Sequence, residues 1–242
     1  MIKTNNKGLL IVVSGPSGAG KDTICQKLIK ENSNIWMSVS MTTRKPRPLE
    51  KDGVDYFFVS SEEFENKIND NTFLEYASYN DNYYGTPKDK VEEKLNEGKD
   101  VILVIDINGA INIKKIIPSA LFIFIMPPDM ETLKNRLIGR KTESKDKVVQ
   151  RFITAYNEVN NYKKYNYVVV NDKVEDAVNK VKSIIQSEKC RVDRIEDIYL
   201  GNKEELIHEI LIDKNFENNY WQLNNHSYII KWLNRYSTKG DI

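Results

Sequence analysis

The stretch that most constrains this chain is Leu9 to Thr23, LLIVVSGPSGAGKDT. A run of apolar, partly β-branched residues up to Val13 ends abruptly in a turn with three glycines, which Lys21 follows. This pattern predicts a buried strand, a tight loop and the first turn of a helix. In the spacing GxxxxGK, backbone N–H groups curl around an anion, and the lysine reaches its phosphates. An ordinary glycine-rich turn would not require a lysine at this offset, so we expect a phosphate chain as the ligand.

The residue after the lysine departs from the usual form of this loop. Asp22 stands where a serine or threonine hydroxyl usually contacts Mg²⁺, and Thr23 supplies a hydroxyl one position later. This arrangement resembles that of several nucleoside monophosphate kinases. The added carboxylate either hydrogen-bonds away from the phosphates or helps to hold the metal through water, and both alternatives stay open.

Composition indicates an ordinary globular chain. Its 242 residues allow one or two domains, and the 36 Lys and Arg nearly cancel the 35 Asp and Glu. A net charge of +1 gives no bulk attraction to nucleic acid or to a membrane surface, so an anion site has to be built locally. The polar N-terminus and the short apolar runs predict a cytoplasmic protein. Cys25 lies among Ile24, Leu28 and Ile29, which predicts a core thiol.

Strand and helix patterns alternate along the chain, which predicts an α/β fold. We expect a parallel sheet with helices on both faces and the ligand at the C-terminal edge of the strands. The predicted strands cover 9–13, 54–59, 72–86, 100–106, 120–126 and 165–172. The predicted helices cover 21–31, 87–97, 108–117, about 145–161 and 174–188, and two more begin at 60 and 129. Pro87 is expected at the first helical position, and Ser60 with Glu63 forms a predicted capping box.

Four charged residues have two readings each from their surroundings alone. Arg44 and Arg47 lie on a proline-stiffened, extended segment that suits a bidentate grip on phosphate, or they belong to a solvated basic loop. Glu75 lies within a strand pattern, and by itself a solvent-facing position is favoured. Asp106 ends a buried strand, where it either accompanies Mg²⁺ or caps the next helix, and both roles are compatible.

Taken together, the motifs resemble those of guanylate kinases, in family order and spacing from about residue 8 to 188. They are GPSGAGK at 15–21, SVSxTTRxPR at 38–47, DYFFV at 55–59, FLE at 73–75, NYYGT at 82–86, ID at 105–106, arginines at 136, 140 and 151, and VND at 170–172. The resemblance implies a P-loop NTPase sheet in a domain of residues 1–188. It also implies an inserted mixed α/β GMP-binding lobe at about 39–89 and a helical lid at about 129–160.

The resemblance also implies roles for the motif residues. The ATP site would comprise Gly15, Pro16, Ser17, Gly18, Ala19, Gly20, Lys21, Asp22 and Thr23, with Asn171 near the adenine. The GMP site would comprise Ser40, Glu75 and Thr86 at the base, Arg44, Arg47, Tyr56 and Tyr84 at the phosphate, Asp106 beside the acceptor, and Gly85. The catalytic cations would be Lys21, Arg44, Arg136, Arg140 and Arg151. Thr23 and Asp106 would hold the metal, directly or through water.

The activity implied is transfer of the ATP γ-phosphoryl group to GMP, giving ADP and GDP, with Mg²⁺ as cofactor. The expected partners are ATP and GMP, without nucleic acid or membrane, and the expected state is a monomer or homodimer. One alternative is a guanylate-kinase-like interaction module without transfer, but such modules typically have a degraded P-loop. Another is a P-loop kinase for a different phosphorylated acceptor, against which Ser40, Glu75 and Thr86 argue.

The sequence departs from the guanylate kinase pattern at two further positions and continues beyond the family motifs. Val104 stands where many relatives have aspartate, and Lys141 follows Arg140 where glycine is usual. Neither removes a phosphate-gripping cation, so we expect activity to survive. Residues 189–242 form a predicted helical extension of unknown role, which we expect to pack on the core or on a second copy.

Overall fold

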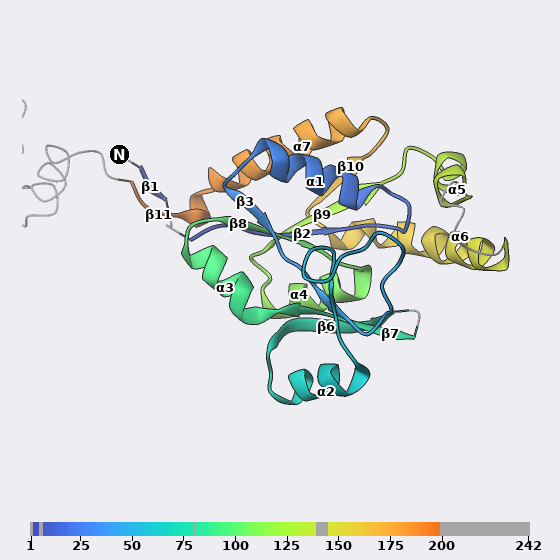
Figure 1. The fold of residues 1–242 in the computed structure, drawn as a ribbon. Coiled ribbons are helices and arrows are strands. Elements are labelled where there is room, and N and C mark those ends of the chain that lie inside the picture. The colour runs from blue at the N-terminus through green and yellow to red at the C-terminus, as the bar shows by residue number, and fades with distance from the viewer. Residues whose placement is uncertain (1, 5–6, 80, 139–144, 199–242) are drawn as a thin grey trace, which may run out of the picture. The chain divides into compact units, whose positions relative to one another are not determined.

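The computed structural model describes residues 2–4, 7–79, 81–138 and 145–198 (Figure 1). The chain divides into two compact units, Met1–Asn5 with Arg191–Ile242, and Asn6–Cys190. In the first unit, strand β1 (Ile2–Thr4) pairs antiparallel with β11 (Ile195–Ile198), and a short 3₁₀ turn covers Val192–Arg194. The helices predicted beyond residue 199 lie outside the described residues. The predicted bounds of domain, lobe and lid stay predictions.

The second unit is built on a five-stranded parallel sheet in the order β10-β9-β2-β8-β3. Its strands are β2 (Leu10–Ser14), β3 (Ile35–Met37), β8 (Asp100–Val104), β9 (Leu121–Met126) and β10 (Tyr167–Val170). The central strand is β2, whose five residues are all buried. A continuously apolar strand is typical of a sheet covered on both faces, and the predicted α/β fold class is confirmed.

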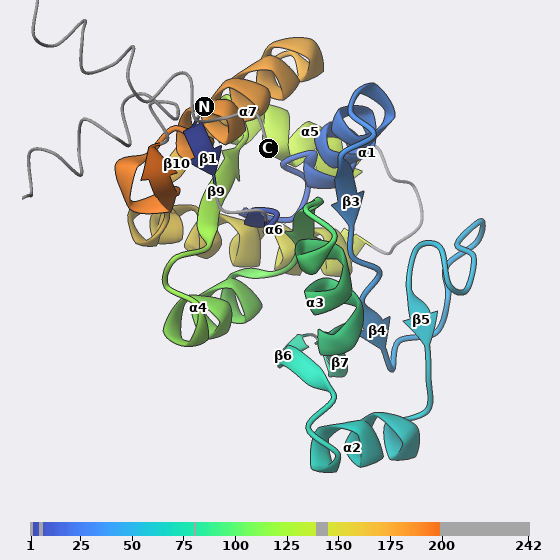
Figure 2. The ribbon, with the colours of Figure 1, turned by 90° about the vertical axis from the view of Figure 1, so that its left-hand side faces the viewer.

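Helices cover both faces of this sheet, as the two views show (Figure 1, Figure 2). Helices α1 (Lys21–Glu31) and α7 (Val174–Lys189) pack on one face, and α3 (Lys88–Asn96) and α4 (Ile107–Ile116) pack on the other. Because alternate side chains of a strand point to opposite faces, Ile11 joins the first cluster and Val12 the second. Cys25 lies in the first cluster, where burial raises its thiol pKa to about 12, so the predicted core thiol is confirmed.

A second sheet, with strand order β5-β4-β7-β6, follows β3 in the chain. Its strands are β4 (Met41–Thr42), β5 (Phe57–Phe58), β6 (Phe73–Tyr79) and β7 (Asn82–Pro87), and helix α2 (Ser61–Asn69) lies in the same region. Ser60 is the N-cap of α2, with the Glu63 N–H donating to Ser60 Oγ at 3.0 Å, which is one of the two bonds of the predicted capping box. The ring of Phe64 stacks on that of Phe73 with centroids 4.5 Å apart.

Three predicted elements need correction here. The stretch 72–86 is an antiparallel hairpin, because Asp81 adopts a φ of 60° and lets the chain reverse. Of the strand predicted over 54–59, only Phe57–Phe58 is a strand. Pro87 is the N-cap of α3 with a ψ of 125°, so it precedes the first helical residue instead of occupying that position. Strand β3 was not predicted, since three residues are too few to show a period.

Helices α5 (Met130–Ile138) and α6 (Lys145–Val159) pack against each other through Leu133, Leu137 and Ala155. A 3₁₀ turn over Asn160–Lys164 leads from α6 towards β10. Residues Arg140 and Lys141 lie outside the described residues. Within the described ranges, none of the helices is both long enough and apolar enough to cross a membrane.

Candidate active site

The glycine-rich loop joins β2 to α1 at the C-terminal edge of the central strand. Two of its glycines are sterically required: a Cβ on Gly15 would lie 2.2 Å from the Ile125 carbonyl oxygen, and one on Gly20 would lie 2.3 Å from Asn171 Nδ2. Gly20 also has a φ of 90°. The loop curls back on its own lysine, since Lys21 Nζ donates to the Gly15 carbonyl at 2.6 Å and to the Pro16 carbonyl at 3.2 Å. This backbone can present N–H groups to an anion.

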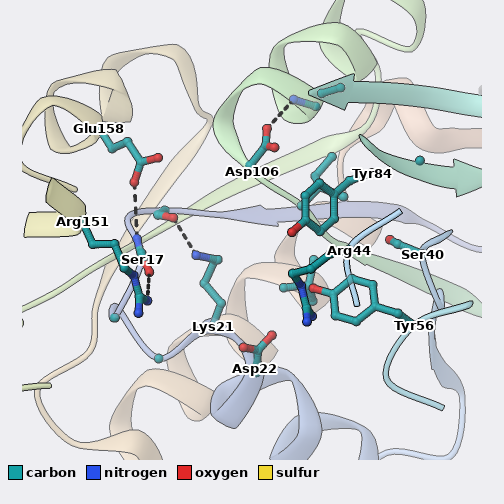
Figure 3. A pocket seen from close by; sticks show the side chains of 18 of the residues that line it. Ser17, Lys21, Asp22, Ser40, Arg44, Tyr56, Tyr84, Asp106, Arg151 and Glu158 are labelled. Atoms are coloured by element: carbon teal, nitrogen blue, oxygen red, sulfur yellow. Dashed lines mark hydrogen bonds between the residues drawn. The ribbon is translucent and has the colours of Figure 1, made fainter. Parts of the chain in front are cut away.

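A cavity of about 220 Å³ opens in front of this loop (Figure 3). Its lining comes from the loop and the first turn of α1, strands β6 and β7, the segments that flank β4 and β5, the end of β8, the start of α4, and α6. The lining residues are Gly15, Ser17, Gly18, Gly20, Lys21, Asp22, Thr23, Ser40, Arg44, Arg47, Tyr56, Glu75, Ala77, Tyr84, Gly85, Val104, Ile105, Asp106, Gly109, Arg151 and Glu158. The cavity therefore brings a phosphate-binding loop together with most of the residues predicted for a second ligand.

Glu75 is the buried acid of this cavity. It is 6% exposed, which overturns the solvent-facing reading of its strand. The Thr86 hydroxyl, on the paired strand, donates to Glu75 Oε1 at 2.8 Å. On the other side, a Cβ on Gly109 would lie 2.9 Å from Oε2, so a glycine is what lets α4 approach the carboxylate. Burial raises the pKa of Glu75 to about 7, against a lowering by Thr86 and with a smaller increase from Asp106.

The cationic side of the cavity is built around Arg44, which lies between Tyr84 and Tyr56 (Figure 3). The guanidinium carbon is 5.4 Å from the centroid of the Tyr56 ring. Burial raises the pKa of Tyr56 to about 12, with Asp22 as the next cause, so its phenol keeps its proton and can donate. Arg47 also lines the cavity. The structure thus brings both predicted arginines to one wall.

Asp106 lies where β8 ends and α4 begins. Its Oδ1 accepts a hydrogen bond from the Gly109 N–H at 2.8 Å, so the predicted helix-capping role is confirmed. The carboxylate also lines the cavity. Among the described residues, no three His, Cys, Asp or Glu side chains converge in a way that could hold a metal ion. A cation here would therefore depend on oxygens of the bound ligands as well as on the protein.

Helix α6 contacts the loop through two side chains seven positions apart, which lie on one face of the helix. Arg151 Nη2 donates to Ser17 Oγ at 2.6 Å, and the Ser17 N–H donates to Glu158 Oε2 at 3.3 Å (Figure 3). Burial raises the pKa of Glu158; Lys21 and the Ser17 N–H oppose this, and Asp106 adds to it. Glu158 was not predicted, although its spacing from Arg151 is a signal that places both on one face.

Some predicted residues lie beside the cavity instead of lining it. Arg136 Nη2 donates to the Asn171 carbonyl at 3.0 Å, and Asn171 Nδ2 donates to the Ala19 carbonyl at 2.7 Å, so this pair supports the loop from behind. Thr86 is fully buried and reaches the cavity only through Glu75. Pro16 is buried within the loop itself. Besides Glu158, sequence reasoning missed Ala77, Ile105 and Gly109.

Comparisons with known proteins agree on one family. The sequence model described as "Guanylate kinase" matches residues 7–188. The chain is 59% identical over 207 residues to the guanylate kinase of Clostridium tetani, covering 86% of this chain and 99% of the relative. It is 54% identical over 201 residues to the guanylate kinase of Caldanaerobacter subterraneus subsp. tengcongensis, covering 83% and 98%.

A solved structure also matches. The crystal structure of guanylate kinase from Anaplasma phagocytophilum superposes with a TM-score of 0.69 at 31% sequence identity. The match covers 87% of this chain and 99% of the other. Sequence and fold therefore point to the same group of proteins.

Proposed function

The chain belongs to the guanylate kinase family, and we propose on that premise that it transfers the γ-phosphoryl group of ATP to GMP. The products are ADP and GDP. The observation that carries the proposal is that Lys21 and the glycine loop share one cavity with Arg44 and the buried Glu75. A donor site and an acceptor site that share one cavity are what direct transfer between two nucleotides requires.

The proposed acceptor is selected through Glu75. Guanine presents N1–H and N2–H₂ donors side by side, and an ionised carboxylate accepts both in a bidentate pair, whereas adenine has no such edge. The Thr86 hydroxyl holds one carboxylate oxygen, and the absence of a side chain at Gly109 leaves room beside the other. Ser40 and Gly85 complete the proposed base contacts from the same wall.

The proposed contacts to the acceptor phosphate come from Arg44, Arg47, Tyr56 and Tyr84. Guanidinium groups bind phosphate oxygens in bidentate pairs, and a phenol that keeps its proton at pH 7 donates to them as well. On the donor side, the proposed contacts are the loop N–H groups and Lys21. Arg136, Arg140 and Arg151 are proposed to add positive charge at the transferring group, and Asn171 to lie near the adenine.

Mg²⁺ is the proposed cofactor, and the residues present suit it. Magnesium usually takes one or two protein oxygens and completes its shell with water and substrate phosphates, and the hydroxyl and carboxylate oxygens that line the cavity are ligands of this kind. Thr23 and Asp106 are the proposed protein groups, directly or through water, and Asp22 lines the same cavity. When bound, the ion would neutralise charge on the β- and γ-phosphates.

The proposed chemistry is an in-line displacement. An oxygen of the GMP phosphate attacks the γ-phosphorus of ATP, and the bond to the β–γ bridging oxygen breaks, so that oxygen leaves with ADP. The attacking oxygen is already ionised, so no general base is needed. Lys21 and the arginines stabilise the charge that spreads over the transferring oxygens. The contacts of Arg151 and Glu158 with Ser17 support closure of α6 over the loop, which would exclude water.

The test is a coupled assay with ATP and a panel of GMP, AMP, UMP and CMP. We expect fast turnover with GMP and weak or no turnover with the others. No turnover with GMP would favour an interaction module, and faster turnover with another monophosphate would favour a kinase for that acceptor. The proposed location is the cytoplasm, where ATP and GMP are available, and sedimentation distinguishes the predicted monomer from the predicted homodimer.

A further inference from the structure

Glu50 makes a set of contacts that the proposed reaction does not yet use. Its carboxylate binds Arg44 in a bidentate pair, with Arg44 Nη2 donating to Oε1 at 2.9 Å and Nη1 donating to Oε2 at 3.0 Å. The two side chains are only 14% and 17% exposed. A partly buried, two-bond pair of this kind fixes the plane of the guanidinium, which a solvated surface pair does not.

The same carboxylate also holds the second arginine of the proposed phosphate site. The backbone N–H of Arg47 donates to Glu50 Oε2 at 2.7 Å, and the Glu50 N–H donates back to the Arg47 carbonyl at 3.1 Å. One acidic side chain therefore ties the guanidinium of one arginine to the backbone of the other. Although burial alone would raise the pKa of Glu50, its bonds to Arg44 and Arg47 lower that pKa below its ordinary value.

Glu50 is the last residue of a tight turn that begins at Arg47. Pro48 and Leu49 form its two central residues, and Leu49 has a φ of 76°. This is the pattern of a type II turn, in which the second central residue is usually glycine, because side chains rarely adopt a positive φ. Leu49 is 97% exposed, so packing does not compensate the strain. The two bonds between Arg47 and Glu50 close the turn and so hold the strained residue in place.

The placement of Glu50 relative to the cavity completes the case. Arg44, Arg47, Tyr56 and Tyr84 line the cavity, and Glu50 is not among its lining residues. The carboxylate thus binds Arg44 without lining the cavity itself. We infer that Glu50 is a positioning residue, which stays paired with Arg44 when GMP binds and orients both arginines towards the GMP phosphate.

This inference rests on the proposed function. An alternative role for Glu50 predicts the opposite change in GMP affinity. If Glu50 merely occupied the phosphate position until GMP arrived, its removal would strengthen GMP binding, because a competing anion would be gone. If it orients the arginines, its removal weakens GMP binding. Calorimetric titration of GMP in the absence of ATP separates the two readings. Such binding is independent of transfer, so a protein that binds GMP without phosphorylating it would defeat the proposed function and still test Glu50.

The variants are Glu50→Gln and, as a matched control, Asp55→Asn. Asp55 lies in the same loop, and its Oδ2 accepts a hydrogen bond from the Lys51 backbone N–H without contacting an arginine. Asp55→Asn therefore removes the same charge as Glu50→Gln and keeps an oxygen that can accept this hydrogen bond. We expect Glu50→Gln to raise the Kd for GMP about tenfold or more, and Asp55→Asn to leave it within about twofold. The KM for ATP should stay near the parent value in both.

The affinity for guanosine tells a specific effect on the phosphate site from a general disturbance of the second sheet, because only a general disturbance would change it. Guanosine lacks the phosphate, so its affinity should be the same in Glu50→Gln and in the parent. An unchanged or lower Kd for GMP in Glu50→Gln, or an equal loss of guanosine and GMP affinity, would overturn the inference.

A double-mutant cycle with Arg44→Lys provides a second test. The lysine keeps the charge but cannot form the bidentate pair, so it should weaken GMP binding by a similar factor. Because Arg44 is one of the two arginines that Glu50 is inferred to orient, Glu50→Gln should cost less GMP affinity in the Arg44→Lys background than in the parent, and the remaining loss comes through Arg47. Fully additive losses would contradict a role through Arg44. If Glu50→Gln does not fold, Glu50→Asp, which keeps the charge but shortens the side chain, takes its place: weaker GMP binding with unchanged guanosine affinity supports the inference, and unchanged GMP binding defeats it.

Discussion

Replacing Glu75 by glutamine should make the protein more stable and its GMP binding weaker. The buried carboxylate has a pKa of about 7 against an ordinary 4.5, and this difference corresponds to about 3 kcal/mol. The raised pKa means that the folded state favours the neutral acid. The stability that protonation provides is therefore fully present below pH 4.5 and is lost as the pH rises to about 7. A glutamine is neutral throughout and keeps an oxygen that can accept from the Thr86 hydroxyl.

The stability gain should therefore depend on pH in a defined way. Near pH 4, below the ordinary pKa of 4.5, the variant and the parent should unfold at nearly the same urea concentration. At pH 8 the variant should be more stable by up to about 3 kcal/mol. Glu62→Gln is a suitable control, since Glu62 is an exposed acid in the first turn of α2 and should show no such gain. Equal or lower stability of Glu75→Gln at pH 8 would refute the claim that burial destabilises the charged carboxylate.

The loss of binding follows from the same substitution. The amide offers guanine one acceptor and turns a donor group towards a second donor, so one charge-assisted bond is lost and one N–H is left unpaired. We expect GMP binding to weaken by about 3 kcal/mol, or about 100-fold in KM, with the KM for ATP near the parent value. An equal loss for both nucleotides, or no change for GMP, would contradict the role proposed for Glu75.

Three further outcomes are expected. Lys21→Ala should lower kcat by about 1000-fold or more while GMP still binds, because the lysine acts on the donor phosphates; parent-like turnover would defeat the proposed reaction. Gly109→Ala should raise the KM for GMP about tenfold, since its methyl group would lie 2.9 Å from Glu75 Oε2, and an unchanged KM would show that α4 or Glu75 shifts at little cost. Truncation after Cys190 should retain GMP-dependent turnover, as residues Asn6–Cys190 form one compact unit; loss of activity in a soluble truncated protein would assign a role to the extension.

Local patterns were sufficient for much of the fold. The glycine loop, the helix caps and the apolar strands each depend on residues within one short stretch, so the sequence predicted α1, α2, α7 and the parallel strands β2, β8, β9 and β10. The hairpin at 72–86 was predicted as one strand although the sequence Asn-Asp-Asn at 80–82 is a turn signal, because asparagine and aspartate tolerate the positive φ that Asp81 adopts. Strand β3 gave too short a pattern to recognise.

For the site, local sequence was a weaker guide than for the fold. Resemblance supplied candidate residues, but the sequence around Glu75 favoured a solvent-facing side chain, and only packing against Thr86 and Gly109 made it a buried acid. The contact of Ser17 with Glu158 joins residues 141 positions apart. The pair of Arg44 with Glu50 depends on a turn in which Leu49 adopts a positive φ, and a leucine does not predict such a turn.

The sequence by itself thus determined which stretches form strands, helices and an anion-binding loop, because backbone preference and hydrophobic period act over a few neighbouring residues. The tertiary structure alone decided which charges are buried, paired or directed into the cavity. Burial and Coulomb energies depend on distances between elements that the chain order does not contain.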